Sequence, residues 1–115
     1  MKLLIATLAT AGMLALFLML FATAANAALD DAKAQELLKK GGCVACHSVD
    51  KKVLGPAYKD VAQKRKGESD AVATLEKAVR NGSKSAYGQI PMPPSPQEKI
   101  SDADLHELVE WVLTK

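Results

Sequence analysis

Apolar residues along this chain recur with the spacing of a helix, and no stretch alternates for long enough to predict a strand. Over residues 70–81, apolar side chains fall at i, i+3 and i+7, which places them on one helical face. These side chains are Val72, Leu75 and Val79. We expect this face to lie on the core. The pattern predicts an all-α fold.

Charged residues, glycine and proline indicate where the earlier helices begin and end. A helix is predicted over residues 30–40, because two aspartates stand at its start, two lysines at its end, and Gly41-Gly42 follows. A shorter helix is expected to start after Gly55-Pro56, since proline suits the first helical position, and to end near Lys64. Both helices flank the segment that contains the cysteines.

The last helix has a clear start signal. Ser101 is followed three residues later by Asp104, a capping-box pattern, and then by an apolar stripe. The stripe consists of Leu105, Leu108, Val109 and Val112. Residues 88–96, before this helix, contain four of the five prolines, so they are expected to form a stiff, non-helical loop. That loop contains Met92.

The first 27 residues resemble a secretory signal. Lys2 precedes a long apolar run, and Ala25 and Ala27 flank Asn26 in an A-x-A cleavage pattern. We therefore expect residues 1–27 to be a signal peptide and 28–115 to be one domain in the periplasm. Because the run exceeds the ~7–15 residues usual for a signal core, a retained membrane anchor facing the periplasm is the alternative.

The remaining domain has few large side chains with which to build a core. Both phenylalanines lie in the first 27 residues, which leaves Tyr58, Tyr87 and Trp111 as the aromatics of residues 28–115. Small domains of this size are marginal without a disulfide, a metal or a similar aid. A buried cofactor would supply the missing core.

The run Cys43-Val44-Ala45-Cys46-His47 has the spacing of a c-type haem attachment site. The two thiols can each add to a haem vinyl group, and His47 can then bind the iron. A disulfide between Cys43 and Cys46 would constrain very little chain. A zinc site would need a second pair of closely spaced ligands, and a thiol oxidoreductase with this C-x-x-C spacing would need a βαβ pattern. The sequence has neither.

Met92 is the candidate for the second axial ligand. The other three methionines lie in the first 27 residues, and a thioether ligand raises the reduction potential relative to a second imidazole. An ordinary core methionine is the alternative. His106 is the rival imidazole, but it falls beside the apolar stripe, near Glu107 and Glu110, and is expected to face solvent.

Four segments together resemble the small bacterial class I cytochromes of the c-551 type: 43–47, 53–61 (VLGPAYKDV), 90–94 (IPMPP) and 111–112 (WV). The likeness covers nearly all of residues 28–115. It implies four to five short helices wrapped around one covalently attached haem c with its iron. It also implies a one-electron carrier, not an enzyme, that serves respiratory protein partners. The donor would be a membrane cytochrome complex, and the acceptor a terminal oxidase or a nitrogen-oxide reductase.

The resemblance implies further roles in the haem environment. The carbonyl of Pro56 would accept the second ring N–H of His47 and fix its orientation. Tyr87 stands where relatives often have a tryptophan that binds a haem propionate, and its hydroxyl would take over that bond. Some relatives have a propionate-binding arginine near position 78, and here Lys77 and Arg80 are the candidates to replace it.

Two other positions depart from the family pattern. Arg65 occupies a place where relatives often carry a buried aromatic, and we expect its stem to cover apolar surface while its head reaches water. Ser95 and the stretch 96–99 also differ, which leaves the local support of Met92 open.

Charge is unevenly distributed along residues 28–115. Residues 32–66 carry nine basic and three acidic side chains, whereas residues 67–115 carry five basic and eight acidic ones. Lysines 39, 40, 51 and 52 flank the haem motif and could attract an acidic redox partner, or merely keep the protein soluble. No nucleic acid or small-molecule substrate is expected, and a monomer is expected. A haem catalyst or gas sensor with a labile Met92 side is the alternative function.

Overall fold

Four α-helices and one short 3₁₀ turn make up the described part of the chain, residues 28–84 and 86–115 of a computed structural model. In chain order these are α1 (Asp31–Lys40), η1 (Cys43–Ala45), α2 (Tyr58–Lys64), α3 (Ala71–Asn81) and α4 (Asp102–Leu113). Strand-like pairing within these residues is limited to one isolated bridge between Ser83 and Met92. The predicted all-α fold is confirmed.

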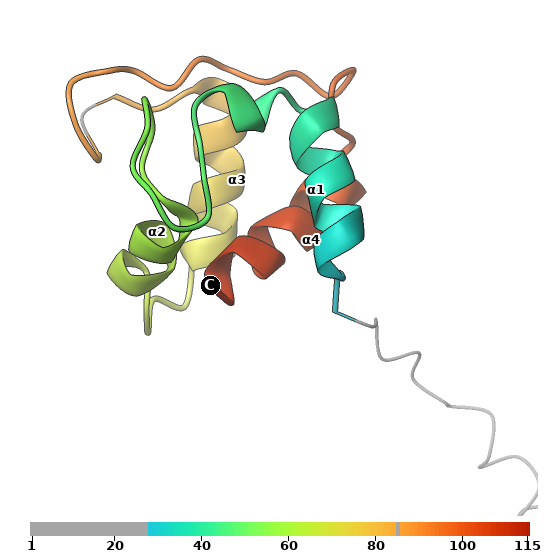
Figure 1. Cartoon of the computed structure of the whole chain (residues 1–115), viewed down its shortest axis with the longest axis horizontal. Helices are drawn as coiled ribbons and strands as arrows, with labels where there is room; N and C mark the ends of the chain where they lie inside the picture. The colour runs from blue at the N-terminus through green and yellow to red at the C-terminus, as the bar shows by residue number, and fades with distance from the viewer. Residues whose placement is uncertain (1–27, 85) are drawn as a thin grey trace, which may run out of the picture.

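Helix α4 contacts each of the other three α-helices (Figure 1). Its predicted apolar stripe is buried, and Trp111 is buried beside it. Helix α1 contributes Ala34, Leu37 and Leu38 to the same core, and α2 contributes Tyr58 and Val61. The apolar stripe predicted for the last helix is thus its buried face.

Two of the helix starts have side-chain caps. The Asp30 carboxylate accepts a hydrogen bond from the Lys33 amide at 2.7 Å, and the Ser101 hydroxyl accepts one from the Asp104 amide at 3.1 Å. Each cap satisfies one of the N–H groups that the first turn of a helix leaves unpaired. The predicted capping at Ser101 is therefore confirmed.

The predicted helix after Gly55-Pro56 is present and ends at Lys64, but Pro56 is not its first residue, because the helix begins at Tyr58 after Ala57 in extended backbone. The amides of Tyr58 and Lys59 donate to the carbonyls of Ser48 and Val49, at 3.0 and 3.1 Å. The first N–H groups of α2 are thus paired with the segment that follows the cysteine motif. This pairing sets the helix start and leaves Pro56 outside it.

The apolar face of α3 is only half-buried. Val72, Leu75 and Val79 pack against the core as expected, but Leu75 and Val79 also line an open cleft. Among the described residues, no helix is long and apolar enough to cross a membrane. The signal peptide expected over residues 1–27 lies outside the described part of the chain.

Candidate haem site

A mainly apolar cleft of about 300 Å³ lies among the segment after the cysteine motif, α2, α3, α4 and the proline-rich loop. Its volume is at the lower end of the roughly 300–1,000 Å³ typical of cofactor and small-molecule sites. Five of the six predicted site residues line it: Cys46, His47, Pro56, Tyr87 and Met92. Cys43 does not line it and instead packs half-buried against the core. The fold therefore brings together residues that are up to 46 positions apart in the sequence.

The cysteine motif forms a tight turn between α1 and the cleft. Gly42 enters it with a φ of +73°, and the amides of Cys46 and His47 both donate to the carbonyl of Cys43, at 3.2 and 3.0 Å. Both cysteines are free thiols. Burial raises the pKa of the Cys43 thiol, and the neighbouring Cys46 adds to the shift. The turn therefore presents His47 directly after two unoxidised thiols.

The His47 imidazole is held from several directions. Its Nδ1 lies 2.8 Å from the carbonyl oxygen of Pro56, and its ring stacks on Tyr58 with centroids 5.2 Å apart. Gly55 lies against the same ring, and a Cβ there would come within 2.6 Å of Cε1. When Nδ1–H donates to a carbonyl, Nε2 keeps its lone pair and can bind a metal. The contact with Gly55 was not anticipated from the sequence.

Backbone pairing holds Met92 close to the end of α3. Ser83 and Met92 exchange two hydrogen bonds, at 3.0 and 2.8 Å, and the Ser95 amide donates to Val79 at 2.8 Å. Gly82 makes this approach possible, because a Cβ there would lie only 2.7 Å from the Met92 carbonyl oxygen. The loop is thus fixed on both sides of Met92.

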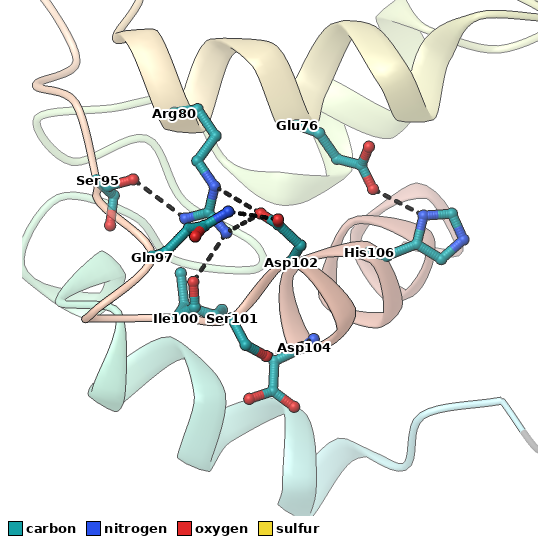
Figure 2. Close-up of polar contacts among 9 residues, drawn as sticks. All are labelled: Glu76, Arg80, Ser95, Gln97, Ile100, Ser101, Asp102, Asp104 and His106. Atoms are coloured by element: carbon teal, nitrogen blue, oxygen red, sulfur yellow. Dashed lines mark hydrogen bonds and ion pairs between the residues drawn. The ribbon is translucent and has the colours of Figure 1, made fainter.

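Arg80 supports the same loop from α3, as Figure 2 shows. Its guanidinium donates to the carbonyls of Ser95 and Ile100, at 3.1 and 2.8 Å, and pairs with Asp102 at 2.7 Å. These bonds supply the support for Met92 that the sequence left open. Arg80 does not line the cleft, and Lys77 is exposed and does not line it either. Neither candidate for the propionate charge partner therefore faces the site.

His106 faces solvent, as expected from its place beside the apolar stripe. Its Nδ1 lies 2.7 Å from Glu76 Oε1 on α3, a partner that the sequence did not indicate (Figure 2). Hydrogen bonding to Glu76 raises the pKa of His106. Within residues 28–84 and 86–115, no three His, Cys, Asp or Glu side chains are grouped in a way that could hold a metal ion. The zinc alternative has no site there.

The lining of the cleft fits a haem in two respects. Val53, Leu54 and Ile90 line it and are more than half exposed, so a flat apolar group would cover them. Arg65 and Tyr87 line the same cleft, and the Arg65 Nε and the Tyr87 hydroxyl are buried without a hydrogen-bond partner. Both groups could donate to a haem carboxylate. The expectation that the Arg65 head reaches water holds in part: its Nη1 pairs with Glu68 at an exposed contact, whereas its Nε is buried.

An all-α fold around an apolar cleft with a C-x-x-C-H turn defines the class of small covalent haem proteins. The cytochrome c family model matches residues 32–115, and the chain belongs to the cytochrome c family. It is 48% identical to cytochrome c-551 of Pseudomonas aeruginosa over 79 residues, which cover 69% of this chain and 73% of that protein. It is 47% identical to cytochrome c-552 of Nitrosomonas europaea, also over 79 residues, covering 69% and 75%.

Solved structures give the same result. The crystal structure of wild-type Nitrosomonas europaea cytochrome c552 matches with a TM-score of 0.64 and 46% identity, covering 70% of this chain and 96% of that one. A class 1 cytochrome from Sideroxydans lithotrophicus matches with a TM-score of 0.63 and 34% identity, covering 76% and 97%. The resemblance to small class I cytochromes of the c-551 type is confirmed, and with it one covalently bound haem c and a role in electron transfer with protein partners.

Proposed function

We propose that this chain is a periplasmic one-electron carrier in which His47 and Met92 are the two axial ligands of the haem iron. The observation that carries the proposal is that both side chains line one cleft and come from segments held by separate bonds. His47 is oriented by Pro56, and Met92 by its pairing with Ser83. Neither ligand depends on the other for its position.

Cys43 and Cys46 would attach the group by thioether bonds. Each thiol would add across one vinyl group, with its sulfur bonded to one vinyl carbon and its hydrogen taken up by the other. This addition is balanced without an oxidant or a reductant. It requires free thiols, and both cysteines are free. Pro56 would complete the haem environment by orienting His47, and Tyr87 would do so by donating a hydrogen bond to a haem propionate.

The bound haem would supply an iron that gains one electron from a donor protein and loses it to an acceptor protein. With His47 and Met92 both ligated, no coordination position is left for a substrate, which favours a carrier over a catalyst or sensor. The hydrogen bonds around His47 and the ties of the Met92 loop would keep both ligands in place in either oxidation state. Little rearrangement would then accompany electron transfer.

The rim of the cleft has the character of a transient docking surface. Val53, Leu54 and Ile90 form an exposed apolar rim, and Lys52 also lines the cleft. Lys39 and Lys51 are exposed nearby in sequence, while Lys40 pairs with Asp104 at 3.7 Å. This positive charge would steer an acidic partner, such as a cytochrome complex as donor and an oxidase or nitrogen-oxide reductase as acceptor. The carrier would act as a monomer after cleavage of residues 1–27.

The test replaces the proposed ligand in protein exported from a host that attaches haem. Visible spectra are recorded for the oxidised, reduced and carbon monoxide-treated reduced forms, and the reduction potential is measured. The native protein should be low-spin and show a sulfur-to-iron band, and its reduced spectrum should not change when carbon monoxide is added. Met92→Ala should bind the gas and have a lower potential, because the thioether no longer stabilises ferrous iron. Glu98→Ala is the matched control and should behave as the native protein does, because Glu98 lies on the same connection between α3 and α4 but is exposed and does not line the cleft.

Two outcomes would overturn the proposal. A potential that Met92→Ala leaves unchanged would exclude Met92 as a ligand. Binding of carbon monoxide by the native protein would show that the iron is open, and would favour a catalyst or sensor over an electron carrier. The mass of the exported protein tests the signal peptide separately, because cleavage after Ala27 leaves residues 28–115 plus one haem.

A further inference from the structure

Two side chains that line the cleft each carry a buried polar group without a hydrogen-bond partner: the Nε of Arg65 and the hydroxyl of Tyr87. Buried hydrogen-bonding groups in proteins are almost always paired, with protein, water or ligand. Both groups can donate, and both belong to side chains that line the proposed haem site. An acceptor bound in the cleft would satisfy them together.

The surroundings hold both donors in place. Arg65 follows the end of α2, and its Nη1 donates to Glu68 at 3.1 Å, which holds one end of the guanidinium while its Nε is buried. Lys64 binds the Ala86 carbonyl at 2.6 Å and places its Nζ 4.3 Å from the centre of the Tyr87 ring. The end of α2 thereby keeps Tyr87 beside Arg65, 22 residues earlier in the sequence.

Charge around the two donors favours an anion. Hydrogen bonding to Glu68 is the main cause of the raised pKa of Arg65. The nearby Tyr87 hydroxyl adds to the shift, although this hydroxyl and the Arg65 Nε do not form a hydrogen bond with each other. Lys64 and Lys52 add positive charge around the cleft, and Glu68 is the negative group that faces Arg65. The guanidinium is cationic at every pH at which the protein is folded.

We propose that Arg65 and Tyr87 together bind one propionate of the haem, with Arg65 as the charge partner that neither Lys77 nor Arg80 can provide. This inference rests on the proposed function, because it requires the haem to lie in the cleft. Arg65 would donate through Nε and Tyr87 through its hydroxyl, and charge-assisted bonds of this kind are shorter and stronger than neutral ones. The propionate would therefore remain ionised at a lower pH than it otherwise does. Arg65 is then a positioning residue that also adjusts the reduction potential.

The test measures the reduction potential against pH in four variants and the native protein. Arg65→Met removes the guanidinium and keeps most of the stem, and Tyr87→Phe removes only the hydroxyl; the double variant combines them. Lys66→Met is the matched control, since it removes the same charge one residue away, from an exposed side chain that does not line the cleft. The infrared carboxylate band of the propionate is recorded as a second readout.

We expect Arg65→Met to raise the propionate pKa that governs the potential by about one unit or more, because an opposite charge in contact lowers a carboxyl pKa by roughly 1–3 units. Tyr87→Phe should raise it less, and the double variant should differ from the sum of the two, because the residues share one acceptor. Both single variants should shift the carboxylate band. Lys66→Met should change neither readout.

A pH profile of Arg65→Met that coincides with that of Lys66→Met would overturn the inference, and so would strictly additive effects in the double variant. Should Arg65→Met fail to accumulate, Arg65→Lys decides the question, because a lysine restores the charge without the Nε donor and should still shift the carboxylate band. Failure of the proposed function is distinguishable, since it would show in the iron-ligand spectrum of the native protein, which these variants should leave unchanged.

Discussion

Gly82→Ala should both destabilise the protein and loosen the Met92 loop. Gly82 has a φ of +78° and a ψ of 169°, a region of backbone conformation that is essentially restricted to glycine. A Cβ at this position would also lie 2.7 Å from the Met92 carbonyl oxygen and 3.2 Å from Pro94 Cδ. Neither atom belongs to a flexible side chain, so the loop itself would have to move.

The expected loss of stability has two parts. The backbone conformation costs about 1–3 kcal/mol for a residue with a side chain. The collision costs roughly 1–3 kcal/mol more, as overpacking does in well-packed sites. We expect a total of about 4 kcal/mol, the middle of the summed range, which in a domain of this size lowers Tm by roughly 16–32 °C.

The assay combines thermal unfolding with the sulfur-to-iron band of the oxidised protein. Gly67→Ala is the matched control, because Gly67 has a similar φ of +82° but a Cβ there would meet no other atom within 4 Å. Gly67→Ala should lower Tm by less and leave the band intact, whereas Gly82→Ala should weaken the band and allow carbon monoxide to bind. Equal losses of Tm in the two variants, with the band intact in both, would refute this account of Gly82.

Two further predictions concern helix contacts away from the cleft. The raised pKa of His106 means that its bond to Glu76 stabilises the fold at low pH and loses this effect as pH rises through the folded pKa; His106→Gln should therefore lower Tm at about pH 5.5 but not at about pH 9. A Tm difference that is independent of pH would contradict this. Ser101→Ala should lower the free energy of unfolding by about 1 kcal/mol through loss of the α4 cap, while Ser101→Asp keeps it; equal stability of both variants, measured by denaturant unfolding, would exclude a role for the cap.

Local sequence patterns were sufficient to predict most of the helices. The aspartates and lysines at its ends were enough to predict helix α1, and Ser101 with the apolar stripe was enough to predict α4. These signals act within a few residues, through capping and through the helical period, so they can be read without the fold. The start of α2 could not, because the bonds that fix it come from Ser48 and Val49, ten residues earlier.

The side-chain partners of the charged residues were the least predictable feature. Arg80 and Arg65 both stood near the expected haem site in sequence, but Arg80 turns to Asp102 and the loop carbonyls. Arg65 instead lines the cleft, and its Nε is buried without a partner. A long side chain can reach several partners at similar cost, and the choice depends on which acceptors the neighbouring elements leave unpaired.

The sequence by itself determined the class of fold, the haem motif and the candidate ligands His47 and Met92, because spacing along the chain carries that information directly. Only the tertiary structure decided that Gly55 fits against the imidazole, that Gly82 lets the loop approach α3, and that Arg65 lines the cleft. Those outcomes depend on the distances between segments that are remote in sequence. Such distances are set by how the helices pack around α4, and no local pattern encodes them.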